Sequence, residues 1–264
     1  MSKFINCFFI GDINGKPGLT LVSSVLKQYL QKYEIDVCIA NGENVSEGKG
    51  IEEKDARTLF DLGVQIITTG NHLWDRWTAK ALLAKERNIL RPLNYPKENA
   101  GNGFVIYDLK EKGKIGVVNL QGRTFMQSID DPFRAADWAV SKIINETKII
   151  FIDIHAEATA EKMALGWHLD GRCSAIVGTH THIPTADARI LPQGTAYITD
   201  VGMSGPYDSV IGMKKEVAIR RFQFQTPFKF EMAEHDVRLC AIFIQIDSET
   251  GKAVKIEQVI FPAF

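Results

Sequence analysis

Residues 3–18 of the chain are KFINCFFIGDINGKPG, an apolar, β-prone run that stops at Gly11-Asp12 and passes into a glycine-rich loop. Residues 19–33 then carry apolar side chains at helical spacing, and residues 37–40 form a second apolar run. This order of strand, loop, helix and strand is typical of an α/β domain. It predicts that residues 3–10 are the first core strand and not a cleaved leader, because no small-residue cleavage site follows them.

The rest of the 264-residue chain continues this alternation and then changes to hairpins. Helical spacing predicts helices over residues 19–33, 52–62, 77–86, 132–145 and 158–169. Apolar, β-prone runs predict later strands over residues 65–69, 103–109, 114–120, 149–154, 175–178, 194–200, 228–233, 237–247 and 253–259. Early strand–helix units followed by hairpins predict two mixed sheets packed together with helices outside. No linker divides the chain, so residues 1–264 are expected to form one domain.

Composition and charge exclude several classes of protein. Hydrophobic residues make up 45% and charged residues 24%, as in globular and not disordered proteins. The net charge of −1 gives no overall basic field for nucleic acid or membrane. No apolar run reaches the ~18 residues of a membrane span. The four cysteines are scattered, without disulfide-scaffold density or CxxC spacing, which predicts buried thiols in a cytoplasmic protein.

Polar side chains follow five of the predicted strands at the point where each strand ends. In an α/β sheet, ligands bind at this carboxyl edge, so we expect the five loops to converge on one site. The residues are Asp12 after the first strand, Glu43 and Asn44 after the second, Asn71 and His72 after the third, His155 after residues 149–154, and His180 and His182 after residues 175–178.

All of these residues except His72 are candidate metal ligands. Carboxylates, amides and imidazoles without thiolates suit divalent Mn, Fe or Zn and argue against an iron–sulfur cluster or a zinc knuckle. Seven ligands are too many for one ion but adequate for two ions that share a carboxylate. Taken alone, an aspartate that follows a strand, as Asp12 does, is more often a turn or helix-cap residue than a ligand. His180 and His182, two residues apart, would point to the same side of an extended segment, and their occurrence with the others favours a dinuclear centre.

The remaining histidines, His168 and His235, lack such a setting. We expect both at the surface or in core packing, because neither follows the end of a predicted strand among other potential ligands.

The same segments resemble a known family. Gly11-Asp12, Gly70-Asn71-His72 and the GTHTH segment at 178–182 resemble the GD, GNH and GHTH motifs of calcineurin-like metallophosphoesterases. The chain is most similar to one branch, the YmdB-like bacterial phosphodiesterases, from about residue 4 to about residue 260. The likeness is carried by GDINGKPG (11–18), NGEN (41–44), GNHLWD (70–75), RPLNYP (91–96), DPF (131–133), HAEAT (155–159), PTADAR (184–189), DVGM (200–203) and GPYDS (205–209).

Two positions differ from the broader superfamily and match this branch. Asn14 stands where the superfamily commonly has histidine, and Glu43 stands where it commonly has aspartate. The resemblance implies a single-domain, four-layer α/β/β/α sandwich with two mixed β-sheets flanked by helices. It also implies two divalent or mixed-valence metal ions, iron before manganese or zinc, although the nitrogen and oxygen ligands alone leave the metal open.

The resemblance also assigns roles to individual residues. Glu43 would bridge the two ions. One ion would be held by Asp12, Asn44 and His182, and the other by Asn71, His155 and His180. His72 would lie beside the ions without binding them, and would contact a phosphoryl oxygen or protonate the leaving oxygen. Asp75 is placed either to orient His72 or to cap the following helix.

The implied activity is metal-dependent hydrolysis of a cyclic nucleotide, 2′,3′- or 3′,5′-cyclic, with a bridging hydroxide as nucleophile. One alternative is a broad phosphomonoesterase or an RNA-directed phosphodiesterase, although no RNA-binding motif is visible. Another is a regulatory protein that binds nucleotide or protein without hydrolysis. Arg123, Phe125, Met126 and residues 202–209 are expected either to line a base pocket or to support the site. The oligomeric state, monomer or homo-oligomer, stays open.

Overall fold

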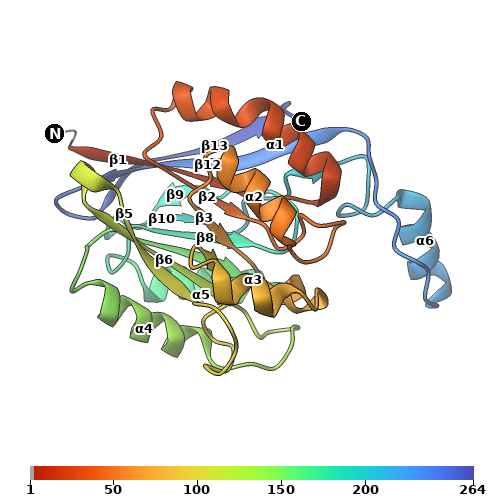
Figure 1. The fold of residues 1–264 in the computed structure, drawn as a ribbon, viewed down its shortest axis with the longest axis horizontal. Helices are drawn as coiled ribbons and strands as arrows, with labels where there is room; N and C mark the ends of the chain where they lie inside the picture. Colours follow the sequence, from red (N-terminus) through yellow and green to blue (C-terminus); the bar gives the residue numbers. More distant parts are fainter. Residues whose placement is uncertain (1–2) are drawn as a thin grey trace.

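Two β-sheets lie face to face at the centre of the computed structural model, which describes residues 3–264, and helices cover their outer faces (Figure 1). The first sheet has the order β11-β12-β1-β2-β3-β4, with β13 paired to β12. Its first four strands in the chain run parallel, and β12 runs antiparallel to β1. Its strands are β1 (Phe4–Ile10), β2 (Val37–Asn41), β3 (Ile66–Thr68), β4 (Ile89–Leu90), β11 (Gly205–Pro206), β12 (Val237–Asp247) and β13 (Ala253–Phe261).

The second sheet has the order β5-β6-β7-β8-β10-β9. Strands β6, β7, β8 and β10 are parallel, and the two edge strands are antiparallel to their neighbours. Its strands are β5 (Phe104–Asp108), β6 (Lys114–Gln121), β7 (Ile150–His155), β8 (Ala175–Thr179), β9 (Arg189–Ile190) and β10 (Ala196–Ile198).

The helices form the two outer layers. The first layer packs on the first sheet and contains α1 (Gly15–Lys32), α2 (Glu53–Asp61) and α3 (Ala79–Lys85). The second packs on the second sheet and contains α4 (Pro132–Ile143) and α5 (Thr159–His168). The short 3₁₀ helices are η1 (Asn71–Asp75) and η2 (Lys110–Lys112), and a sixth helix is α6 (Lys215–Phe224).

Three buried apolar layers hold these elements together. One lies between each sheet and its helices, and the third lies between the sheets, where the rings of Phe9 and Phe151 are 5.4 Å apart. Strands that are buried on both faces read as continuous apolar runs, which is why β1, β2, β7 and β8 were visible in the sequence. The four-layer α/β/β/α prediction, two mixed sheets flanked by helices, is confirmed.

The region after residue 210 differs from the prediction. The strand predicted over residues 228–233 is wrong, because this segment makes only one isolated bridge among the described residues, Met213 to Met232, and pairs with no strand of either sheet. Helix α6 was missed because its apolar residues do not form a core-facing stripe: Phe222 is 74% exposed and Phe224 is 62% exposed. Figure 1 shows this helix projecting away from the sheets.

The structure also tests the predicted start of the third helix and the predicted burial of the cysteines. Trp77 is 91% exposed and lies outside the third helix, which begins at Ala79 instead of at residue 77. All four cysteines are free and buried, as expected. Within residues 3–264 we find no helix with the length and apolar character that a membrane crossing requires.

Candidate metal centre

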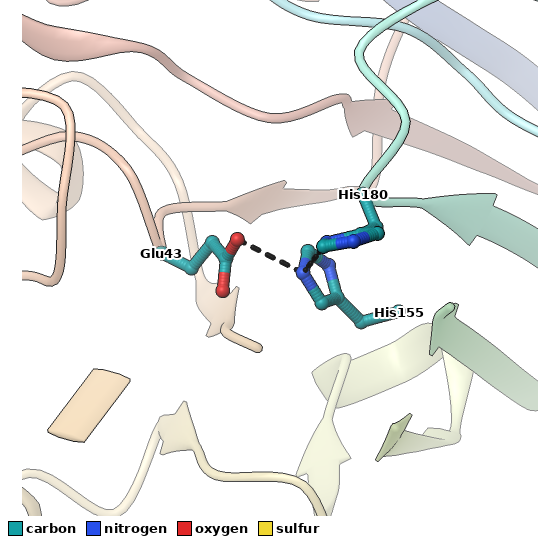
Figure 2. Close-up of side chains that lie close together, drawn as sticks. All are labelled: Glu43, His155 and His180. Atoms are coloured by element: carbon teal, nitrogen blue, oxygen red, sulfur yellow. Dashed lines mark hydrogen bonds and ion pairs between the residues drawn. The ribbon is translucent and has the colours of Figure 1, made fainter. Parts of the chain in front are cut away.

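The strand ends of both sheets bring the predicted ligands together. Asp12 follows β1, Glu43 and Asn44 follow β2, and Asn71 opens η1 directly after β3. His155 is the last residue of β7, and His180 and His182 follow β8. All seven side chains are buried or half-buried. Figure 2 shows Glu43, His155 and His180 pointing toward one another, each at or just after the end of a different strand.

His155 has an unusual number of partners at its Nε2 atom. Glu43 Oε1 lies 2.9 Å from this nitrogen and Asn71 Oδ1 lies 3.1 Å from it. His180 Nδ1 lies at 3.0 Å. One imidazole proton cannot satisfy three acceptors at once, whereas a cation is stabilised by such a set of donor atoms. Glu43, His155 and His180 each offer a ligand atom, and the three atoms lie within 4.8 Å of one another, so this group could hold a metal ion.

The other predicted ligands adjoin this group. Asn44 Nδ2 lies 3.1 Å from Glu43 Oε1 and 3.1 Å from His182 Nε2. The amide nitrogen of Asn44 therefore lies between two electron-pair donors. If the amide group were flipped, its oxygen would take this position and could bind a cation. Asp12 accepts a hydrogen bond from the His180 backbone N–H at 3.0 Å through Oδ2, while its buried Oδ1 has no hydrogen-bond partner among the described residues. An unpaired buried carboxylate oxygen fits a site built for a cation.

Burial and mutual charge strongly shift the pKa values in the cluster. Burial acts to lower the pKa of His155, but the carboxylates of Glu43 and Asp12 raise it to about 9. Burial acts to raise the pKa of Glu43, but the charge and hydrogen bond of His155 lower it to about 2. Burial and the charge of His155 lower the pKa of His180 to about 3. Without metal, a proton on His155 therefore balances the charge of Glu43 at neutral pH.

The outer nitrogens of two histidines are fixed by hydrogen bonds. The Thr179 hydroxyl donates to Asp153 Oδ1 at 2.7 Å, so it accepts the Nδ1–H of His155, 2.9 Å away. His182 Nδ1 donates to the carbonyl of Ile211 at 2.9 Å. In both rings these bonds leave Nε2 facing the cluster. Such outer contacts orient metal-binding histidines and fix their tautomers.

The segment from Thr179 to His182 is not extended, which corrects the expectation for the histidine pair. His180 and His182 have φ angles of 101° and 68°, in a region that non-glycine residues rarely occupy. As a result the two rings are not parallel neighbours: His180 faces His155, and His182 faces Asn44. Backbone strain of this kind is kept only where surrounding contacts enforce it.

A buried ion pair supplies those contacts. Lys162 Nζ on α5 lies 2.8 Å from Asp200 Oδ2, and both side chains are fully buried. Asp200 also accepts hydrogen bonds from the backbone N–H and the hydroxyl of Thr181, at 3.1 and 2.8 Å. Lys162 Nζ donates to the Thr179 carbonyl at 3.2 Å. The Lys162–Asp200 pair thus holds Thr181, the residue between His180 and His182, in place.

Sequence reasoning missed Lys162, Asp200 and Asp153 as supports of the site. The available signal was a charged residue at a core position, since Asp153 interrupts the apolar run of β7 and Lys162 lies on the buried face of α5. Gly70 has a clear reason to be glycine, because a Cβ there would collide with Glu43 and His155.

His72 lies beside the cluster without joining it. Its backbone N–H donates to Glu43 Oε2 at 3.1 Å. Its ring is half-exposed, and Nδ1 of the ring lies 2.9 Å from Asp75 Oδ2. Asp75 therefore contacts His72, and it does not cap α3, whose N-cap is Thr78. The other two histidines lie outside the site: His168 pairs with Asp137 at the surface, and His235 is exposed.

The residues expected either to line a base pocket or to support the site have mixed positions. Arg123 pairs with Asp131 at 3.0 Å, and Phe125 is 88% exposed. The cavity that borders Asn71 is lined from the same loop by residues 127–130 instead. Within 202–209, Met203 and Tyr207 contact the His182 backbone, so this part supports the histidine segment.

Comparisons with known proteins identify the family and the fold of the chain. The sequence matches the family described as YmdB-like protein over residues 8–259. It is 48% identical to the 2′,3′-cyclic-nucleotide 2′-phosphodiesterase of Bacillus subtilis (strain 168), over 96% of this chain and 95% of that protein. A crystal structure of a novel phosphatase from Mycoplasma pneumoniae has a TM-score of 0.93 and 36% identity, covering 99% of this chain and 94% of that chain. A hypothetical protein from Thermus thermophilus has a TM-score of 0.90 and 41% identity, covering 97% of this chain and 99% of that chain.

Proposed function

The chain belongs to the YmdB-like family, as its motifs indicated, and from this premise we propose that it is a metal-dependent phosphodiesterase acting on cyclic nucleotides. It is a phosphoric ester hydrolase, since its relatives are named as phosphodiesterase and phosphatase. Among cyclic nucleotides we favour the 2′,3′-cyclic class over the 3′,5′-cyclic class, because the Bacillus subtilis relative is named for it. The chain's partner is then a small phosphodiester.

The observation that carries this proposal is the crowding of donor atoms around His155 Nε2. Three partners lie within 3.1 Å of that atom, and all three are buried or half-buried side chains. The donor set is nitrogen and oxygen only, which suits iron, manganese or zinc. We place iron first and assign the protein to the cytoplasm, where its free buried cysteines remain reduced.

The contacts support the assignment of ligands to two ions. Glu43 lies between the halves, because its Oε1 contacts both His155 and Asn44. One half contains Asn44 and His182, which contact each other, and the other contains Asn71, His155 and His180. Asp12 contacts the His180 backbone, and we assign it to the Asn44–His182 half from the family resemblance. Two ions bound there would supply a water-derived nucleophile and neutralise the charge of the phosphate.

His72 is suited to assist the leaving oxygen. Its Nδ1 is held by Asp75, and its backbone N–H donates to Glu43, so the residue is fixed beside the cluster. In this position the imidazolium can donate a proton to the departing alkoxide. The Asp75 carboxylate, 2.9 Å from His72 Nδ1, orients the ring for this step.

Replacing the bridge tests the proposal. Glu43→Ala should remove metal from the purified protein and abolish turnover of 2′,3′-cyclic nucleotides, while Glu47→Ala, on the same loop and with an 87% exposed side chain, should retain both. Metal content is measured by elemental analysis and turnover by product release. A Glu43→Ala protein that kept both would contradict the proposal.

A second candidate, a phosphomonoesterase, is favoured by the name of the Mycoplasma pneumoniae protein, which is called a phosphatase. Comparing turnover of cyclic nucleotides, p-nitrophenyl phosphate, bis-p-nitrophenyl phosphate and short RNA separates the activities. Binding of a cyclic nucleotide to the metal-loaded protein without any product would instead identify a regulatory binder.

A further inference from the structure

A cavity of about 640 Å³ opens directly beside the candidate metal centre. Its principal wall residues are Asn71, Trp74, Tyr95, Asn99, Gln127 and Asp130. Asn71 belongs to both sites, because its Oδ1 contacts His155 Nε2 at 3.1 Å. A substrate whose phosphate lies at the metal centre therefore has this cavity as the adjoining space for the rest of the molecule. The size is in the range of pockets that enclose small ligands.

Two aromatic rings are fixed in the wall of the cavity. Trp74 and Tyr95 have ring centroids 5.8 Å apart at an interplanar angle of 58°. Tyr95 is only 7% exposed, and its hydroxyl donates to Gln121 Oε1 at 3.0 Å. Gln127 Oε1 lies 3.4 Å from the same hydroxyl. Such preordered rings offer an apolar, aromatic wall at low entropic cost, which suits a planar heteroaromatic group.

The charges of the cavity exclude a second phosphate group. None of the described residues that line it is lysine or arginine, whereas Asp75 and Asp130 contribute carboxylates. Asn99 and Gln127 add amides that can both donate and accept hydrogen bonds. The lining therefore suits an uncharged group that carries its own hydrogen-bond donors, as the hydroxyls of ribose and the amino groups of bases do.

A larger neighbouring cavity is lined by charged residues of both signs. It has a volume of about 1010 Å³, shares Tyr95, Pro96 and Asp130 with the first, and is lined also by Arg91 and Arg134. Asn71 is not among its lining residues. Because charges of both signs line it and none of the candidate metal ligands does, it is the poorer place for a neutral group attached directly to the reacting phosphate.

We infer that the cavity bounded by Asn71, Trp74, Tyr95 and Gln127 holds the nucleoside of the substrate, which makes Trp74 and Gln127 specificity-determining residues. This inference rests on the proposed function and adds the part of the substrate that the metal centre does not contact. The base lies against the Trp74–Tyr95 pair, and the amides and carboxylates bind its polar edge and the ribose. Recognition is by aromatic packing and neutral hydrogen bonds, without an ion pair.

The first test compares a cyclic nucleotide with an abasic cyclic diester. The ratio of kcat/KM for 2′,3′-cyclic AMP to kcat/KM for glycerol 1,2-cyclic phosphate should fall about tenfold in Trp74→Ala, as expected for one lost stacking contact. Gln127→Ala should also lower the ratio, and its exposed side chain is not needed for folding. Trp77→Ala is the matched control, because Trp77 lies three residues on and is 91% exposed. Unchanged ratios in both Trp74→Ala and Gln127→Ala would overturn the inference.

The second test measures binding without turnover. Adenosine 3′-monophosphate should quench the tryptophan fluorescence of the metal-loaded protein, and Trp77→Phe should retain this quenching while Trp74→Phe loses it. Inorganic phosphate should not produce the Trp74-dependent signal. Equal quenching in wild type and Trp74→Phe, or none in either, would overturn the inference. Quenching that depends on Trp74 in a protein that hydrolyses no cyclic nucleotide would support the nucleoside cavity and refute the proposed function, so the two failures are distinguishable.

Discussion

His155 shows how a single buried side chain can indicate a metal ion. Its Nε2 faces one carboxylate, one amide oxygen and one imidazole, all within 3.1 Å. The pKa of about 9 means that the ring is protonated at neutral pH when no metal is present. That proton occupies the place in which a cation would be bound, and it must leave before the nitrogen can act as a ligand.

The first prediction follows from this proton. At pH 7 to 8, His155 is below its raised pKa and charged, whereas His180 and Glu43 are above theirs and already deprotonated. Metal binding should therefore release about one proton from His155, and apparent affinity should fall as the pH is lowered. Calorimetric titrations in buffers of different ionisation enthalpy measure the release. Binding enthalpies that do not depend on the buffer would contradict this account.

The second prediction concerns His72. His72→Ala should lower kcat for a cyclic nucleotide by about 10²–10⁴-fold, because a general acid is lost, while metal content is unchanged. The loss should be much smaller for bis-p-nitrophenyl phosphate, whose leaving group needs no proton. Asp75→Asn should have a smaller effect in the same direction, since Asp75 acts through His72. Equal losses on both substrates would exclude the acid role.

At the scale of elements, five strand ends and one ion pair build the centre. The parallel strands β1, β2 and β3 deliver one set of side chains, and β7 and β8 of the facing sheet deliver the other. The segment after β8 needs additional support, because His180 and His182 both have positive φ angles. Lys162 from α5 and Asp200 from the segment after β10 provide it through Thr181.

The third prediction tests that ion pair. Lys162→Met should destabilise the fold by about 3–5 kcal/mol, because it leaves the Asp200 carboxylate buried without its partner charge. The variant should also bind metal more weakly, since Thr181 is less firmly held. Lys162→Met combined with Asp200→Asn should recover part of both losses, because no buried charge remains and the acceptor for Thr181 is kept. Denaturant unfolding and metal titration give the two readouts, and normal metal affinity in Lys162→Met would refute the positioning role.

Across the whole molecule, the packing of the two sheets places the two halves of the centre opposite each other. Phe9 and Phe151 meet in the layer between the sheets, and both are fully buried. We predict that the 264 residues unfold as one domain, because this layer is continuous and joins strands from both ends of the chain.

The fourth prediction tests that packing. Phe151→Ala should lower the free energy of unfolding by about 3–5 kcal/mol through the cavity it leaves. Phe125→Ala is the control, because Phe125 is 88% exposed and should change stability little. Far-ultraviolet circular dichroism and tryptophan fluorescence should report a single coincident transition in each protein. Two separate transitions would contradict the single-domain prediction.

The sequence predicted the layers and the gathering of the site residues because both depend on local patterns. An apolar run followed by a polar residue identifies a strand end, so Asp12, Glu43 and His155 could be placed at the sheet edge from the sequence alone. The orientation of His180 and His182 could not be predicted from the sequence, because it depends on long-range contacts from Lys162 and Asp200. Helix α6 was missed for a related reason: it has no core to face, so its sequence has no apolar stripe.

The nucleoside cavity was equally hidden from the sequence. Trp74 of η1 and Tyr95 and Gln127 of two loops are far apart in the sequence, and only the folded chain brings them to one wall. Phe125, which the sequence analysis named as a possible pocket residue, is 88% exposed and does not line this cavity, whereas Gln127 of the same loop does. Pocket residues drawn from different loops leave no periodic pattern, whereas strand ends do.

The central claim is that these side chains hold two metal ions that hydrolyse a cyclic phosphodiester. The most direct test is a titration of chelator-treated protein with iron(II) or manganese(II), in which turnover of 2′,3′-cyclic AMP and metal bound per chain are measured on the same samples. We predict negligible turnover in the stripped protein and a plateau at about two ions per chain, with no recovery in Glu43→Ala. Full turnover in the stripped protein, or a plateau in Glu43→Ala equal to that of the wild type, would contradict the account.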